Sequence, residues 1–269
     1  MDELFDRTWT NIAVTRREAV AEVALARPEA RNALNGELME ELTEAAQLLR
    51  LRTDVLAVIL TGTESYFSAG ADLSASQARA AQPTLLEGRR TVMAGPDLCK
   101  AWEEIEAVTI AAIEGYCIGG ASALAVSCDF RVMGHTAYMR LPEVPLGMNM
   151  SWRTLPKLVA LAGPSRAKQY VMFGEAADAQ RCLDWGFADE LVAAGQALTA
   201  ARRWADKVAA LPPLPVRMTK EAVNAIAAAT AQASIYMDRD QYLLMSRTDD
   251  YREGIAAFRE KRPGKFKGD

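Results

Sequence analysis

The first regular pattern of apolar and polar positions predicts a β-hairpin. Residues Asn11–Thr15 and Ala19–Leu25 alternate in part between apolar and polar side chains. The triplet Arg16-Arg17-Glu18 between them is polar, as expected of a turn. We therefore expect two neighbouring strands near the start of the chain.

A helix is predicted directly after this hairpin. It begins near Glu37, where Asn35 is placed to cap the free N–H groups of the first turn. The apolar residues that follow recur at spacings of four, three and four and therefore share one helix face: Leu38, Leu42, Ala45 and Leu49.

Two continuous apolar runs, Val55–Leu60 and Val108–Ile113, are typical of strands buried on both faces of a sheet. The segment Leu98–Glu106 has a helical pattern and precedes the second run. The segment Ala121–Ser127 follows that run, and Asp129–Met133 has the pattern of a further strand. Because strands here alternate with helices, we expect βαβ crossovers and an α/β fold.

The remainder of the chain is nearly all helical in pattern. From Ser151 onward, Phe187–Val192 interrupts the helices and predicts a short strand. Three prolines within 212–215 precede two more helices. We therefore divide the chain into a β/α core, residues 1–200, and a helical C-terminal region, residues 201–269.

Composition narrows the class of protein. Of the 269 residues, 50% are apolar, which is ample for a packed core, and the net charge of −4 argues against nucleic acid as a partner. No apolar run approaches the roughly 20 residues of a membrane span, and the acidic N-terminus lacks the apolar stretch of a secretory signal. The four cysteines lack metal-binding spacing and are expected to be reduced, and the single histidine, His135, is expected in a surface turn. We expect a soluble cytoplasmic enzyme without a metal.

Two loops of small residues are candidates for chemistry. Phe67–Leu73 comes shortly after the first buried run, and Gly115–Ala121 comes directly after the second. Small residues let backbone N–H groups approach a ligand, and two such donors that converge on one oxygen form an oxyanion hole. Alternatively, Gly119 and Gly120 only allow close packing of a helix against a strand. Neither loop has a GxGxxG or P-loop pattern, so a dinucleotide or nucleoside triphosphate is disfavoured.

Five segments, in order along nearly the whole chain, carry a family resemblance. They are Leu25–Asn35 (LARPEARNALN), Phe67–Leu73 (FSAGADL), Ile110–Asp129 (IAAIEGYCIGGASALAVSCD), Leu141–Gly147 (LPEVPLG) and Asp249–Phe266 (DDYREGIAAFREKRPGKF). On these segments the chain resembles the crotonase superfamily, the enoyl-CoA hydratases and isomerases. The resemblance implies a crotonase-type ββα spiral with a helical C-terminal region. It also implies assembly as a homotrimer or dimer of trimers through that region, and a place in fatty acid metabolism.

The resemblance also assigns roles to individual positions. In the family, two backbone N–H groups polarise the thioester carbonyl of an acyl-CoA and stabilise its enolate, and they map to Ala71 and Gly120. Coenzyme A is therefore expected as part of the substrate, with no separate cofactor. For Arg31 and the basic stretch Arg259–Lys267, the alternative to CoA binding is that both are ordinary solvated surface. The positions expected along the CoA path are Ala30, Arg31, Ala69, Asp72, Leu73, Phe258 and Lys261.

The acid–base residues depart from the family pattern. Family hydratases use two glutamates, and this chain has Ala123 at one of these positions and Glu143 at the other. A single carboxylate can move a proton between two carbons and so isomerise a double bond, whereas hydration is better served by two groups. We expect an enzyme of the enoyl-CoA hydratase/isomerase type with Glu143 as its single acid/base. The alternatives are a catalytically silent acyl-CoA-binding protein and a family hydrolase or decarboxylase.

The segment after Glu143 departs from the family too. Where the family often has a turn rich in glycine and proline, this chain has Gly147–Arg153. Its two methionines and Trp152 either make that side of the pocket bulkier and drier or pack as ordinary helix residues. Asn149 and Ser151 are candidates for hydrogen bonds to a polar substrate group.

Two further features bear on the substrate. Arg140 either pairs with Glu143 and lowers its pKa or binds an acidic acyl group. The segment Gln77–Arg90, polar and rich in small residues, is where we expect the size of the acyl pocket to be set.

Overall fold

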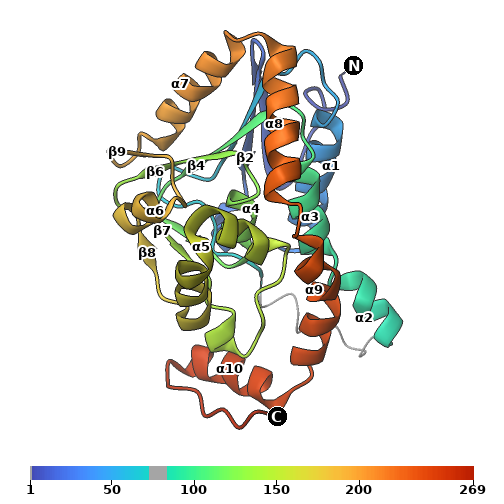
Figure 1. Cartoon of the computed structure of the whole chain (residues 1–269), viewed down its shortest axis with the longest axis vertical. Coiled ribbons are helices and arrows are strands. Elements are labelled where there is room, and N and C mark those ends of the chain that lie inside the picture. Colours follow the sequence, from blue (N-terminus) through green and yellow to red (C-terminus); the bar gives the residue numbers. More distant parts are fainter. Residues whose placement is uncertain (1, 73–83) are drawn as a thin grey trace.

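The computed structural model describes residues 2–72 and 84–269, and its centre is a six-stranded sheet (Figure 1). The strand order is β1-β2-β3-β4-β6-β9, with β1 antiparallel to β2 and all later neighbours parallel. The predicted hairpin and the βαβ succession are thereby confirmed. The strands are β1 (Ile12–Arg17), β2 (Val20–Leu25), β3 (Ala57–Thr61), β4 (Val108–Ile113), β6 (Phe130–Gly134) and β9 (Glu190–Val192).

A second, three-stranded sheet lies beside the first. It consists of β5 (Tyr116–Ile118), β7 (Tyr138–Arg140) and β8 (Ala177–Asp178), with β5 parallel to β7 and β7 antiparallel to β8. These strands are two or three residues long, too short to give a hydrophobic period of their own. Strand β5 lies inside the stretch that the sequence predicts as a glycine-rich turn.

Helices cover both faces of the large sheet. Helix α7 (Ala197–Ala209) packs four buried alanines on one face, against apolar residues of β3 and β4. The boundary drawn at residue 200 therefore falls inside a helix whose contacts are with the sheet. Helices α1 (Gly36–Leu49), α3 (Ala94–Glu103) and α4 (Gly120–Ala125) bury their apolar sides in the core on the other face (Figure 1).

Helix α1 forms as the sequence predicts. The Asn35 side chain accepts a hydrogen bond from the Leu38 N–H at 2.9 Å, which satisfies one free donor of the first turn. All four predicted face residues are fully buried, and the indole N–H of Trp102 from α3 donates to the Leu42 carbonyl at 3.2 Å.

The remaining helices form the C-terminal arm and the surroundings of the site. Helix α8 runs alongside the sheet and buries none of its own residues, and α9 and α10 continue beyond the sheet (Figure 1). Among the described residues, no helix is both long and apolar enough to cross a membrane. The helices are η1 (Pro28–Ala30), α2 (Leu85–Thr91), η2 (Val144–Leu146), α5 (Thr154–Phe173), α6 (Ala179–Trp185), α8 (Pro213–Ala227), α9 (Gln232–Met245) and α10 (Asp249–Glu260).

Candidate active site

The two predicted loops lie side by side. They follow β3 and β4, which are parallel neighbours, so both loops leave the same edge of the sheet. The Ser68 N–H donates to the Tyr116 carbonyl at 3.1 Å, and the Ile118 N–H donates to the Ser68 carbonyl at 3.2 Å. Backbone hydrogen bonds therefore fix the first loop against β5, inside the second.

Two glycines bring the predicted oxyanion donors into one place. Gly70 has φ +87°, and a Cβ there would be 2.3 Å from the Ile118 carbonyl oxygen, which only a glycine avoids. Ala71 and Gly120 are the residues next to Gly70 and Gly119. Across the described ranges, 2–72 and 84–269, neither the Ala71 N–H nor the Gly120 N–H donates to a protein acceptor. Both donors remain available to a ligand oxygen.

A third segment, residues 27–35, is attached to the first loop through a residue that the sequence did not single out. Asn32 is fully buried; its side chain accepts from the Arg27 N–H at 3.0 Å and donates to the Phe67 carbonyl at 3.0 Å. The Ser68 hydroxyl donates to the Asn32 carbonyl at 2.6 Å, and Arg27 pairs with Asp72 at 2.9 Å. The sequence shows only an asparagine between Arg31 and Ala33, a residue type that is common in turns.

Four of the predicted CoA-path residues gather around these loops. Ala30 ends η1, Arg31 follows it with φ +54°, and the Ala69 N–H donates to the Arg31 carbonyl at 3.1 Å. Asp72 lies at the end of the same loop, whereas Leu73 lies outside the described residues. Arg31 is exposed, so its side chain is accessible from solvent, and its contact with a CoA phosphate stays a prediction.

The two predicted C-terminal contacts lie elsewhere. Phe258 is on α10, and Lys261 ends that helix with φ +52°. Both side chains are exposed, and α10 packs mainly against η2. Within the described ranges, no hydrogen bond or ion pair joins Phe258 or Lys261 to Ala30, Arg31 or Ala69, so a shared CoA contact remains a prediction.

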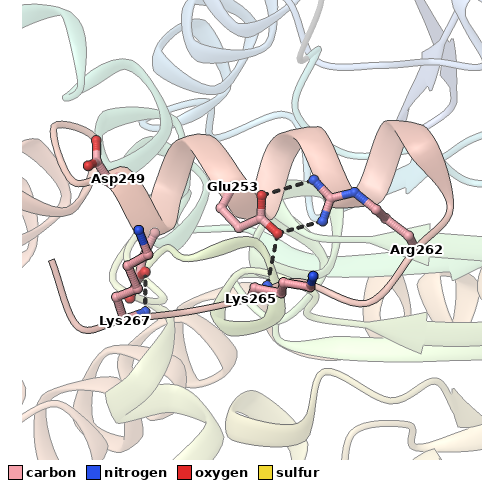
Figure 2. Close-up of a pocket in the computed structure, with 6 residues that line it drawn as sticks. Asp249, Glu253, Arg262, Lys265 and Lys267 are labelled. Carbon is pink, nitrogen blue, oxygen red and sulfur yellow. Dashed lines mark hydrogen bonds and ion pairs between the residues drawn. The ribbon is translucent and has the colours of Figure 1, made fainter.

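A pocket of about 340 Å³ lies between α10 and the C-terminal tail (Figure 2). In Figure 2, Arg262 points toward Glu253 and pairs with both of its oxygens, at 2.5 and 2.9 Å. Glu253 also accepts from the Lys265 N–H at 2.8 Å. Part of the tail's positive charge is thus neutralised within the chain. The lining residues, three acidic and three basic, include none of the predicted site residues: Asp249, Asp250, Glu253, Arg262, Lys265 and Lys267.

Glu143 lies against the second loop. It immediately precedes η2, and its carbonyl accepts from the Met148 N–H at 2.9 Å, which fixes the local backbone. A Cβ on Gly119 would be 2.9 Å from the Glu143 Oε1 atom, so the carboxylate lies directly over the glycine that precedes Gly120. The Oε2 atom is buried and has no hydrogen-bond partner among the described residues. A carboxylate with an unused oxygen therefore lies beside the predicted oxyanion hole.

Comparison with known proteins assigns the chain to a family. The sequence matches the family model for enoyl-CoA hydratase/isomerase over residues 15–269. The chain belongs to this family.

Some known proteins are similar to the chain in sequence, and solved structures are similar to it in fold. The chain is 31% identical to the 2,3-dehydroadipyl-CoA hydratase of Escherichia coli K12 over 259 residues, 96% of this chain and 99% of that protein. It is 33% identical to a probable enoyl-CoA hydratase of Mycobacterium tuberculosis over 262 residues, 96% of this chain and 98% of that one. The structure of an enoyl-CoA hydratase from Mycobacterium avium subsp. paratuberculosis matches with a TM-score of 0.86 at 20% identity, covering 97% of this chain and 100% of that chain. These matches confirm the crotonase-type fold.

Burial decides the acidity of Glu143 in this family member. Removal from water raises its pKa to about 7. The positive charge of Arg140 acts in the opposite direction and is a smaller effect. The Arg140 Nε donates to the Gly174 carbonyl at 2.6 Å. Within the described ranges no ion pair joins Arg140 to Glu143, so the lowered pKa that pairing would give is not found. A carboxyl with a pKa near neutrality suits a group that both accepts and returns a proton.

Glu114 and Asp129, the acids nearest to position 123 along the chain, do not take the place of a carboxylate there. Ala123 is fully buried on α4. Glu114 accepts from the Ala197 N–H at 2.9 Å, and Asp129 pairs with Lys220 at 2.7 Å. Both acids therefore have structural partners.

Other polar groups near Glu143 were less visible in the sequence. Burial, with a smaller contribution from the Glu143 charge, raises the pKa of Tyr170 on α5 and of Tyr242 on α9. Both phenols stay neutral at ordinary pH. The Asn149 side chain has both polar atoms buried without a partner among the described residues, which keeps it a candidate for contact with a polar substrate group. Their positions depend on long-range packing, which a single sequence does not display.

Proposed function

We propose that this chain isomerises the double bond of an enoyl-CoA through a thioester enolate, with Glu143 as its single acid/base. The observation that carries the proposal is the buried Glu143 carboxylate over Gly119, beside two free backbone donors and a position 123 without a carboxylate. Coenzyme A enters as part of the substrate, and no further cofactor is proposed.

Each step uses groups already described. The N–H groups of Ala71 and Gly120 bind the thioester oxygen and stabilise the negative charge that develops there. Glu143 removes a proton from C2 of a 3-enoyl-CoA, and the electrons pass into a dienolate. The protonated Glu143 then gives this proton to C4, so the double bond moves to C2–C3 and the carboxylate is regenerated.

Hydration of a 2-enoyl-CoA is the second candidate, and the names of the relatives favour it. One is a 2,3-dehydroadipyl-CoA hydratase, and another, from Syntrophomonas wolfei, is a crotonyl-CoA hydratase at 30% identity. With one glutamate, Glu143 would have to serve both the attacking water and the carbon. A silent acyl-CoA-binding protein and a hydrolase or decarboxylase of the same family are further outcomes for the test.

The test offers crotonyl-CoA and a 3-enoyl-CoA to the purified protein side by side, with chromatographic separation of the products. We expect conversion of the 3-enoyl to the 2-enoyl thioester with little 3-hydroxyacyl-CoA. Conversion of crotonyl-CoA to its 3-hydroxyacyl-CoA, with the 3-enoyl-CoA left unchanged, would favour the second candidate. Binding without conversion would favour the silent binding protein.

We also propose that the chain assembles as a homotrimer or dimer of trimers and acts in the cytoplasm. The buried, unpaired cysteines support an intracellular location. Helix α8 supports the assembly, because it exposes large apolar side chains: Leu214, Met218, Val223 and Ile226.

Light scattering on the purified protein tests the assembly. We expect the mass of three or six chains, and replacement of Ile226 with Asp is expected to shift it toward one chain. A monomer at micromolar concentration would contradict the proposal. Leu51, exposed at the end of α1, provides the control position, where the same substitution should leave the mass unchanged.

A further inference from the structure

The Trp152 indole is wedged between two helices at the predicted oxyanion hole. A Cβ on Gly95 of α3 would be 2.0 Å from Trp152 Cε2, and a Cβ on Gly120 of α4 would be 2.5 Å from Trp152 Cη2. The ring therefore lies directly on the backbone of both glycines, with no room for a methyl group on either. Gly120 carries one of the two predicted oxyanion donors.

The same ring lies against a glycine one helix turn from the substituted position. Gly120 and Ala123 are three residues apart on α4 and share a face, about 5–6 Å from each other. Family hydratases carry a glutamate at the position of Ala123, one of the two that add water to the double bond. In this chain the carboxylate is absent there, and an aromatic ring lies one turn away. The two changes act in the same direction, since each makes this side of the site less able to hold a water molecule.

The surrounding structure holds the ring in place at some cost to the backbone. Trp152 and Arg153 both have left-handed backbones, with φ +59° and +60°, which is unfavourable for side chains of this size. Asp238 of α9 accepts from the Arg153 N–H at 3.1 Å, and Glu103 of α3 accepts from the Arg153 Nε at 3.1 Å. Because hydrogen bonds to two helices fix this strained turn, the ring is held in one position. A side chain that only filled space would not need a turn fixed in this way.

We infer that Trp152 determines the reaction outcome by keeping water away from the bound enoyl thioester. Hydration adds the hydroxyl of water to C3 and a proton to C2, so it needs a water molecule beside the double bond. The indole occupies the space beside Gly120, one helix turn from Ala123, where such a water would approach. With water excluded, addition at C3 is blocked, and the dienolate formed from a 3-enoyl thioester is protonated at C4, which is isomerisation. This inference rests on the proposed function.

Removal of the ring tests it. Trp152→Ala and Trp152→Gly are compared with the unmodified protein on a 3-enoyl-CoA in ¹⁸O-labelled water, with the ratio of labelled 3-hydroxyacyl-CoA to 2-enoyl-CoA as the readout. The glycine variant also relieves the left-handed strain, so it keeps the test valid if the alanine variant does not fold. We expect the ratio to rise at least tenfold in both. Trp152→Phe keeps an apolar ring and is expected to retain the original ratio.

Trp204→Ala is the matched control. Trp204 packs on Phe130 and donates to Glu190, on the α7 face of the sheet. We expect it to leave the product ratio unchanged. An unchanged ratio in folded Trp152→Gly would overturn the inference, and so would complete loss of turnover in that variant, because the ring would then support the chemistry itself. An unmodified protein that converts no enoyl-CoA would instead overturn the proposed function, and the inference with it.

Discussion

Replacement of Glu143 with Gln is expected to lower kcat/KM for the enoyl-CoA reaction by about 10²- to 10⁴-fold, the usual contribution of a general acid/base. The amide has the shape of the carboxyl group but cannot accept the proton from carbon. Because the backbone donors of Ala71 and Gly120 are unaffected, the dissociation constant of an acyl-CoA is expected to stay within a few-fold. Steady-state kinetics and calorimetric binding measure the two quantities separately. Turnover that survives the substitution would exclude Glu143 as the acid/base.

The same residue predicts the pH dependence of the reaction. Only ionised Glu143 can take a proton from carbon, and burial raises its pKa to about 7. We therefore expect kcat/KM of the unmodified protein to rise with pH up to about 7 and then level off, and to fall about tenfold per pH unit below it. A profile that is flat from pH 5 to 9 would contradict this assignment.

Stability provides the control for both experiments. The folded protein disfavours the charged form of Glu143, whose pKa is raised from an ordinary 4.5 to about 7. No penalty applies below the unfolded value; as pH rises from about 4.5 to 7 the free energy of unfolding falls by about 3 kcal/mol from this group. Glutamine is neutral at every pH. Glu143→Gln is therefore expected to unfold at a higher temperature than the unmodified protein at pH 8, and at nearly the same temperature at pH 4.5.

Local signals in the sequence were sufficient for the elements that carry their own pattern. Strand β4 has the predicted bounds, and α1 begins at the predicted cap. Helix α3 begins at Ala94, four residues before the start that its apolar pattern predicts. The sequence missed this start because glycine and proline, at positions 95 and 96, are unfavourable inside helices. Proline is tolerated in a first helical turn, and the packing of Trp152 requires a glycine at position 95. That requirement comes from a distant part of the chain.

The sequence predicted the loops of the site, but it did not predict the net effect of burial and of Arg140 on the pKa of Glu143. Two loops after neighbouring buried strands were expected to meet, and the hydrogen bonds of Ser68 with Tyr116 and with Ile118 show that they do. The effect of Arg140 on the pKa of Glu143 depends on the direction in which the Arg140 guanidinium points. The guanidinium is held by the carbonyl of Gly174, the residue that follows α5, far along the chain from Arg140. Burial and orientation are set by the whole fold, so neither could be read from the motif around Glu143.

The second large effect is expected at Gly70, which holds the two loops together. In Gly70→Ala the new Cβ would lie 2.3 Å from the Ile118 carbonyl oxygen, on a backbone with φ +87°. Because the Ile118 carbonyl belongs to the backbone, we expect the added methyl group to push the two loops apart. The expected loss of stability is on the order of 3 kcal/mol. The Ala71 N–H then moves away from the thioester oxygen. Loss of one oxyanion donor lowers kcat by about 10²- to 10³-fold, and kinetics with thermal unfolding measure both effects.

Gly195→Ala separates the steric clash from the backbone conformation. Gly195 has φ +78°, close to that of Gly70, but no atom lies within 4 Å of the added Cβ. We expect it to lose on the order of 1 kcal/mol from the left-handed backbone alone and to keep full activity. Equal losses of stability in the two variants would mean that the Ile118 contact contributes nothing. A stable, fully active Gly70→Ala would show that the junction between the loops does not position Ala71, and the oxyanion hole would then have to be sought elsewhere.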